Sequence, residues 1–244
     1  MPMDTGSYFD AYWKQRFNPA AFKRRVRTLH KNYAQRLPAG QQARIVEVGP
    51  GFGEMLEYLS TRGYAECIAL DNDAALIRAL QARGAKGAVH VEDAIAWLSQ
   101  HPAEFDCIVA LHVLEHFEAA AGAQLLRAMF DALTPGGTVI LEVPNMANFI
   151  TAPYARWADY THRQGFTHES LSAALRAAGF EIVECFGVTR AVGSLAELGA
   201  YTIQRLTEVI AWLLLKANYP QSRIIATPAI AIVGRRFASQ VARA

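Results

Sequence analysis

The feature that most constrains the fold is an apolar run that passes directly into three closely spaced glycines. Residues 45–48 read Ile-Val-Glu-Val, residues 49–53 read Gly-Pro-Gly-Phe-Gly, and a helix-forming stretch begins at Glu54. Such a short apolar run predicts a buried strand. Glycines permit a sharp turn and let the backbone approach a ligand that a Cβ atom would push away. The segment therefore predicts a strand, loop and helix that bind a nucleotide-like cofactor.

The glycine spacing differs from that of a dinucleotide-binding loop. In the pattern G-x-G-x-x-G, a helix N-terminus is aimed at a pyrophosphate. Here Gly53 comes one residue early, Pro50 removes an amide donor, and Glu47 places a carboxylate on the strand. These differences favour a cationic ligand that carries no phosphate.

Four further segments follow in a fixed order, as alternating strands and helices of an α/β domain require. A second apolar run over residues 67–71 ends in Asp71, whose carboxylate could accept hydrogen bonds from both hydroxyls of a ribose. Taken alone, such an acid could equally cap the next helix. The remaining segments are residues 88–94 with Asp93, residues 105–111 running into His112–His116, and the turn at residues 133–137 before a strand at 138–143.

Together, these five segments resemble the motifs of class I S-adenosylmethionine (SAM) dependent methyltransferases. The resemblance implies a Rossmann-like α/β fold: seven strands in the order 3-2-1-4-5-7-6, the last antiparallel, flanked by helices. It implies that SAM, and the product S-adenosylhomocysteine, lie across the carboxyl ends of strands one, two and four. The cofactor-binding residues it implies are Glu47, Gly49, Pro50, Gly51, Gly53, Asp71, Asn72, Asp93, Ala94, Leu111, His112 and Val113.

The residues His112-x-x-Glu115-His116 also fit the inverzincin pattern, in which two histidines hold zinc. That pattern belongs within a helix and needs a third ligand, whereas here it directly follows a predicted strand. We therefore predict no bound metal, with His112 at the cofactor pocket and Glu115 and His116 opening the next helix. A zinc hydrolase is the rival interpretation, and it predicts stoichiometric metal.

Composition is consistent with one catalytic domain over residues 41–244. A chain of 244 residues that is 52% hydrophobic can bury a sizeable core. Its three cysteines lie in apolar runs without ligand spacing, which predicts core thiols in a reducing compartment. The N-terminus lacks the charged and apolar regions of a signal peptide, so we expect a cytoplasmic protein.

Residues 1–40 are predicted to form a helical cap. Residues 1–44 carry nine lysines or arginines against two acids, whereas the rest of the chain is acidic, with 15 basic and 20 acidic residues. The interleaved aromatic residues resemble the N-terminal helices that lie over the cofactor in small-molecule methyltransferases, although a helix that merely docks on the core would look the same. A functional cap would favour an anionic substrate or an acidic membrane surface. The acidic body argues against nucleic acid.

Residues 159–171 read Asp-Tyr-Thr-His-Arg-Gln-Gly-Phe-Thr-His-Glu-Ser-Leu, with Thr167 as a good helix N-cap. This run resembles a bacterial subgroup of quinone-methyltransferase-like enzymes met in surface-polysaccharide and sugar pathways. The resemblance implies that Asp159 and His162 face the transferred methyl group. We predict His162 as the catalytic base, oriented by Asp159, with His116 as the second candidate. Alternatively, Asp159 and His162 pin the loop to the core.

An insert over residues 191–220 precedes the last predicted strand at residues 224–236. Apolar residues recur in it at three- or four-residue steps, interrupted by Glu197, Arg205 and Glu208, which predicts one or two amphipathic helices and excludes a transmembrane span. Packing on the domain or on a second subunit, as in a homodimer, is the default expectation. Peripheral membrane contact through residues 191–216 is the alternative.

The predicted activity is methyl transfer from SAM to an oxygen of a small-molecule acceptor, a sugar or a polysaccharide or secondary-metabolite precursor. Alignment of donor and acceptor supplies most of the rate, and a base is needed only when the acceptor is an alcohol. Two alternatives remain. A quinone or phenol O-methyltransferase would have an apolar acceptor pocket, and a non-catalytic SAM-binding protein would lack a base.

Overall fold

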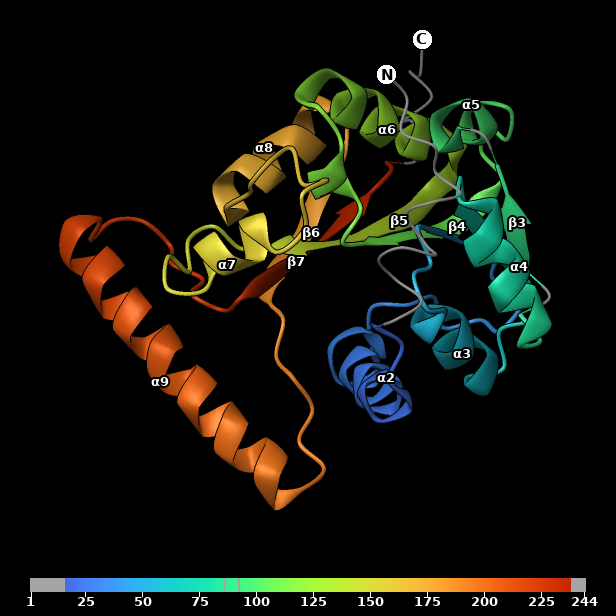
Figure 1. The fold of residues 1–244 in the computed structure, drawn as a ribbon. Helices are drawn as coiled ribbons and strands as arrows, with labels where there is room; N and C mark the ends of the chain where they lie inside the picture. Colours follow the sequence, from blue (N-terminus) through green and yellow to red (C-terminus); the bar gives the residue numbers. More distant parts are fainter. Residues whose placement is uncertain (1–15, 86, 92, 238–244) are drawn as a thin grey trace, which may run out of the picture.

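The computed structural model describes residues 16–237, apart from residues 86 and 92, and contains a seven-stranded sheet (Figure 1). The strand order is β3-β2-β1-β4-β5-β7-β6, which confirms the predicted order. The predicted cap residues before Arg16 lie outside the described residues. The strands are β1 (Ile45–Val48), β2 (Cys67–Asp71), β3 (Ala88–His90), β4 (Phe105–Leu111), β5 (Leu133–Pro144), β6 (Glu181–Gly187) and β7 (Ala229–Arg235).

Strands β1 to β5 pair in parallel, whereas β7 runs antiparallel to both of its neighbours, β5 and β6. A parallel sheet covered on both faces favours continuous apolar strands. All four residues of β1 are buried, and the only polar one among them is Glu47. A buried carboxylate is costly unless it is hydrogen-bonded or paired with a positive charge, so Glu47 needs such a partner at the end of the strand.

The predicted turn at residues 133–137 lies inside β5 rather than before it. Phe105 pairs with Leu133 and Cys107 pairs with Thr138, so the residues between Leu133 and Thr138 form an irregularity in the ladder. Gly136 has a φ of +87°, which a glycine adopts without strain. The glycine therefore has the conformation of a turn, but the strand continues through it.

Helices cover both faces of the sheet (Figure 1). Polar side chains cap several of these helices. Thr167 and Ser170 form a capping box at the start of α8, which confirms the predicted N-cap. Glu115 and His116 do not open α6; they lie in a short 3-10 helix, Leu114–His116, that ends before it. The α-helices are α2 (Pro19–Tyr33), α3 (Glu54–Thr61), α4 (Ala74–Ala82), α5 (Ala94–Ser99), α6 (Ala119–Ala132), α7 (Ala152–Trp157), α8 (His168–Ala177) and α9 (Leu195–Asn218).

The core has two layers because successive side chains of a strand point to opposite faces. In β4, Ile108 packs in the layer that contains α5, α6 and α8 residues, whereas Cys107 and Val109 pack with residues of α2 and α3. The chain order reverses at β1, between β2 and β4, which is the switch point where open α/β sheets bind ligands.

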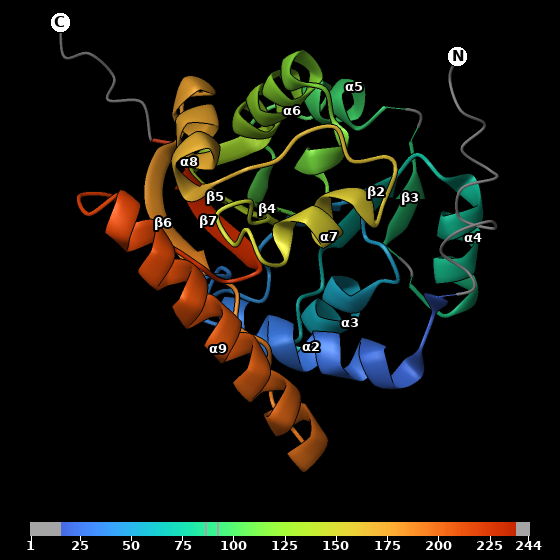
Figure 2. The ribbon, with the colours of Figure 1, turned by 60° about the vertical axis from the view of Figure 1, so that its left-hand side comes forward.

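Helix α9 runs along one side of the domain and contacts it sparingly (Figure 2). Only Glu208 and Ala211 of its 24 residues are buried. Among the residues that the structure describes, no helix, α9 included, is both long and apolar enough to cross a membrane.

Candidate functional site

A cavity of about 1000 Å³ opens at the carboxyl ends of β1, β2 and β4. Its volume is at the upper end of that of small-molecule pockets, which leaves room for a cofactor and an acceptor together. It brings together eleven of the twelve predicted cofactor-binding residues and all three candidate catalytic residues. These are Glu47, Gly49, Pro50, Gly51, Asp71, Asn72, Asp93, Ala94, Leu111, His112 and Val113, with His116, Asp159 and His162.

Gly53 is the predicted cofactor residue that does not line the cavity. It caps α3 with a φ of +84°, and a Cβ atom there would lie 2.9 Å from Leu80. Gly53 is therefore needed for the backbone turn and for packing against α4. Gly49 does line the cavity; its φ is +70° and a Cβ atom there would lie 2.6 Å from Val113 Cγ2, so the turn at this position requires a glycine.

Glu47 supplies an unsatisfied acceptor at the wall of the cavity. The residue is 4% exposed, and its Oε2 atom has no hydrogen-bond partner among the described residues. Burial raises the pKa of this carboxyl well above its usual range. A buried carboxylate oxygen without a partner is costly, so it marks a place where a ligand with N–H donors or a positive charge binds favourably. The amino group and sulfonium of SAM fit this wall.

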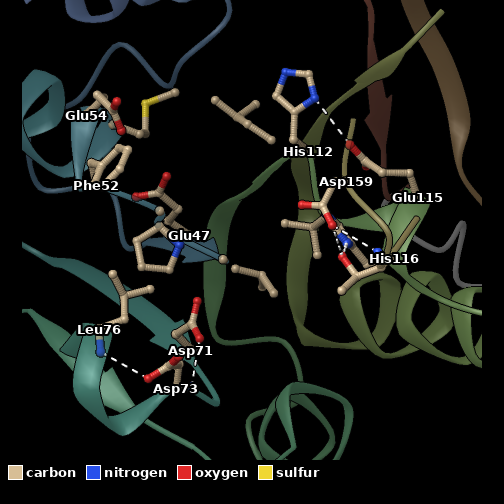
Figure 3. Close-up of a pocket in the computed structure, with 18 of the residues that line it drawn as sticks. Glu47, Phe52, Glu54, Asp71, Asp73, Leu76, His112, Glu115, His116 and Asp159 are labelled. Carbon is tan, nitrogen blue, oxygen red and sulfur yellow. Dashed lines mark hydrogen bonds and ion pairs between the residues drawn. The ribbon is translucent and has the colours of Figure 1, made fainter. Parts of the chain in front are cut away.

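Three aspartates lie at the ends of β2 and β3, and each has a structural hydrogen bond. Asp71 Oδ1 accepts from the Asp73 backbone N–H at 2.8 Å, and burial raises the Asp71 pKa to about 6. Asp73 and Asp93 cap α4 and α5 through their Oδ1 atoms. Figure 3 shows Asp71 on the same side of the cavity as Glu47, across from His116 and Asp159. Asp93 thus combines the capping role with a place at the cavity wall.

A buried ion cluster centred on Glu142 forms beside the cavity, and sequence reasoning did not find it. Glu142 Oε1 accepts from Arg25 Nη2 at 3.0 Å and from His112 Nε2 at 2.9 Å, while its Oε2 accepts from the Tyr33 hydroxyl. The other ring nitrogen of His112 lies 3.2 Å from Glu115 Oε1. The cluster ties α2 to the ends of β4 and β5.

The charges of this cluster reinforce one another. Burial opposes ionisation, but Arg25 and His112 hold the pKa of Glu142 well below its usual range. Conversely, Glu142 and Glu115 outweigh burial and raise the pKa of His112 to about 9. His112 is therefore an imidazolium near neutral pH. Its side chain keeps 42% of its surface accessible, and its φ of +57° is a strained conformation for a non-glycine residue.

A second polar cluster joins His116 to the loop after β5. Thr161 Oγ1 donates to Asp159 Oδ1 at 2.6 Å, and Thr161 Oγ1 also lies 2.7 Å from His116 Nδ1. Because the single hydroxyl proton of Thr161 is used by Asp159, Thr161 can only accept from His116 Nδ1–H. This assigns the tautomer and leaves the lone pair on His116 Nε2. Burial lowers the pKa of His116, so the ring is neutral near pH 7.

His162 packs edge-on against His116, with ring centroids 4.7 Å apart. Glu115, His116 and His162 bring possible ligand atoms within 4.8 Å of one another, and Glu115 Oε2 has no hydrogen-bond partner among the described residues. Such a group could hold a cation. The predicted absence of metal therefore stays a prediction that elemental analysis must decide.

The residues that sequence reasoning missed are Arg25, Tyr33, Glu142 and Thr161. Thr161 stood in the quoted run beside His162, and its hydroxyl was the available signal. The other three lie on α2 and β5, and nothing in their spacing shows that they meet at one carboxylate.

Comparisons with known proteins show which family the chain belongs to. The sequence profile of a methyltransferase domain family matches residues 12–185. The chain is 27% identical over 203 residues to a ubiquinone biosynthesis O-methyltransferase of Xylella fastidiosa, covering 76% of this chain and 80% of that protein. It is 30% identical over 134 residues to trans-aconitate 2-methyltransferase of Variovorax paradoxus, covering 53% of this chain and only 50% of that protein's length.

Solved structures show the same fold. A SAM-dependent methyltransferase from Archaeoglobus fulgidus superposes with a TM-score of 0.65 at 23% identity, covering 93% of this chain and 99% of that one. At this identity the likeness establishes the architecture alone. The family profile, by contrast, spans well over half of the sequence. The chain therefore belongs to the methyltransferase domain family and is a SAM-dependent methyltransferase.

Proposed function

We propose that the enzyme methylates a hydroxyl oxygen of a small-molecule acceptor of the sugar or polysaccharide-precursor class, with His116 as the catalytic base. The observation that carries this proposal is the chain of hydrogen bonds from Asp159 through Thr161 to His116. An alcohol is a poor nucleophile at neutral pH and must lose its proton as it reacts, whereas a carboxylate acceptor needs no base. A neutral histidine held in one tautomer suits the alcohol.

His116 replaces His162 as the favoured base for a geometric reason. The predicted role of His162, with Asp159 orienting its ring, stays a prediction; the contacts given by the structure run from Asp159 Oδ1 to the backbone N–H and the hydroxyl of Thr161. That hydroxyl reaches His116. His162 then forms the neighbouring wall of the acceptor space through its ring contact with His116.

SAM supplies an electrophilic methyl group bound to a sulfonium. The protein residues do the rest: Glu47 accepts from the cationic part, Asp71 accepts from the ribose hydroxyls, and Gly49 allows close approach to the loop. His116 Nε2 takes the acceptor proton, and the charge that develops on the ring is stabilised through Thr161 by Asp159.

A phenol or quinone acceptor is the second candidate, and two observations favour it. One is the similarity to ubiquinone biosynthesis O-methyltransferases. The other is the aromatic surface of the segment that borders the cavity, where Tyr154, Trp157 and Tyr160 are 80%, 73% and 60% exposed. A phenol ionises far more readily than an alcohol, so its methylation would depend less on His116.

The test measures transfer of radiolabelled methyl from SAM to a panel of nucleotide sugars, simple phenols and trans-aconitate. With an alcohol acceptor, we expect His116→Ala to lower turnover by roughly 10² to 10⁴ while the affinity for S-adenosylhomocysteine stays unchanged. His162→Ala separates the two histidines, and it should keep more of the rate than His116→Ala. Full turnover in His116→Ala would remove the base assignment, and transfer to phenols alone would select the second candidate.

Thr161 separates a positioning role from a purely structural one. Thr161→Val should lower kcat and shift the acid limb of the plot of kcat against pH, because His116 then loses its hydrogen bond to the loop. Thr161→Ser keeps the hydroxyl and should restore both. An unchanged profile in Thr161→Val would show that the chain of hydrogen bonds serves only to hold the loop.

A further inference from the structure

Helix α9 carries a long apolar stripe on the side that faces away from the domain. Most of the residues recur at three- or four-residue steps, so they share one side of the helix. Each exposes between 47% and 87% of its surface. The stripe consists of Leu195, Leu198, Ile203, Leu206, Val209, Ile210, Leu213 and Leu214.

The other side of α9 holds the helix to the domain. Glu197 pairs with Arg27 at 3.1 Å, and Lys31 lies 5.5 Å from the centre of the Tyr201 ring, so the first half of α9 is fixed to α2. Farther along, Glu208 and Ala211 are buried. No other described helix or strand lies on the outer side of α9 (Figures 1 and 2). The residues of the stripe are accordingly exposed in the part of the chain that the structure describes.

The size of the stripe matches that of a protein interface. A helix of 24 residues is about 36 Å long. Stable protein interfaces bury about 800 Å² on each partner, and eight half-exposed side chains of leucine size offer apolar area of this order. Isolated apolar side chains are normal on a protein surface, but a continuous patch of this extent marks an interaction site.

The charges of α9 favour a protein over a lipid bilayer. The helix has four charged residues, and all are engaged within the chain: Glu197 with Arg24 and Arg27, Arg205 with Glu208, and Lys216 with the Pro220 and Ser222 carbonyl groups. Helices that lie on membranes carry a polar face rich in lysine and arginine. The stripe of α9 is instead electrically neutral, so nothing repels an identical surface.

We propose that α9 pairs with α9 of a second copy of this chain, antiparallel, across a two-fold axis near Leu206. Leu206 lies at the middle of the helix, so it would meet itself across the axis. This register places large residues opposite small ones: Leu213 faces Gly199, and Ile210 faces Thr202. Among the described residues, apart from the neighbouring backbone of the helix, no atom lies within 4 Å of the position of a Cβ atom on Gly199, so there is open space for a leucine.

The mass in solution is the first test, by light scattering on a sizing column at micromolar protein. We expect twice the 26.8 kDa of one chain. The double variant Leu206→Glu, Leu213→Glu should run as a monomer with unchanged circular dichroism and unchanged S-adenosylhomocysteine affinity. Val183→Glu, at a residue that is 46% exposed on β6, is the matched control and should stay dimeric. A monomeric wild type, or a dimer that survives the double variant, overturns the proposal.

Cysteine cross-linking tests the register. A disulfide needs Cα atoms within about 7 Å. Leu206→Cys should therefore cross-link to itself under mild oxidation, whereas two Leu195→Cys residues would lie roughly 33 Å apart and should not. Cross-linking of both variants would overturn the antiparallel pairing. Vesicle sedimentation gives a second result that would overturn the pairing. If the wild type is monomeric and sediments with phosphatidylglycerol vesicles, and the double variant does not sediment with them, the stripe binds a bilayer instead.

Discussion

Replacing Glu142 with glutamine should destabilise the protein severely, because this buried carboxylate neutralises two cations, Arg25 and His112, whose side chains are 27% and 42% exposed. Glutamine keeps the shape and one acceptor oxygen but removes the charge that faces Arg25 at 3.0 Å and His112 at 2.9 Å. Glu142 is 1% exposed, so water cannot replace the lost interactions. Removing one partner of a buried ion pair costs about 3 to 5 kcal/mol. We expect a loss of that size in the free energy of unfolding in urea near pH 7.

An exposed ion pair in the same protein provides the matched control. Arg36 and Glu184 are 2.8 Å apart, but the Glu184 side chain is 44% exposed. Exposed pairs contribute about 0 to 1 kcal/mol, so Glu184→Gln should be nearly neutral. If Glu142→Gln also cost less than about 1 kcal/mol, the cluster would not hold α2 to the sheet, and the reasoning from burial would be wrong.

The effect of Glu142→Gln should also depend on pH in a defined direction. The pKa of His112 is raised to about 9, above its ordinary value of 6.5. Its contribution to stability is therefore fully present below pH 6.5 and is lost as the pH rises through about 9. The difference in the free energy of unfolding between wild type and Glu142→Gln should therefore become smaller as the pH rises from 6.5 to about 9. It should not vanish, because Arg25 stays charged. A difference that widens with pH would contradict the assignment of His112 as an imidazolium.

Two further predictions concern the cofactor side of the cavity. The pKa of Asp71 is raised to about 6, so below that pH protons should compete with the ligand hydroxyls for the carboxylate. Calorimetry should show the affinity for S-adenosylhomocysteine falling by up to about tenfold per pH unit in this range. In Asp71→Asn the affinity should depend less on pH. Gly49→Ala should weaken S-adenosylhomocysteine binding and cost about 1 to 2 kcal/mol of stability, because φ is +70° and the new Cβ atom would meet Val113. Gly40→Ala is the control: its Cβ atom would have open space among the described residues, so neither binding nor stability should change.

The sheet order could be predicted through the resemblance to methyltransferases, because the motifs that carry this resemblance contain residues with distinctive local constraints. Gly49 needs a positive φ, Asp71 ends a buried strand, and Gly136 allows the irregularity in β5. These requirements are local, so they are visible in a single chain. Gly53 shows the limit of this reasoning, since a positive φ alone does not say whether a glycine faces the ligand or a neighbouring helix.

The polar clusters could not be predicted because their members are brought together only by the fold. Arg25 and Tyr33 of α2 meet His112, at the end of β4, on the carboxylate of Glu142 in β5. Likewise, sequence proximity suggested that Asp159 serves His162, whereas side-chain geometry links Asp159 to His116, 43 residues away, through Thr161. Separation along the chain carries no information about such contacts.

The most direct test of the central claim is calorimetric titration of the purified chain with S-adenosylhomocysteine, beside Asp71→Ala. We expect one site per chain in the wild type. Each hydrogen bond to a charged acceptor is worth about 1.5 to 3 kcal/mol, so Asp71→Ala should bind at least about tenfold more weakly. No binding to the wild type would contradict the assignment of the cavity to SAM, and equal affinity in Asp71→Ala would remove the ribose contact from Asp71.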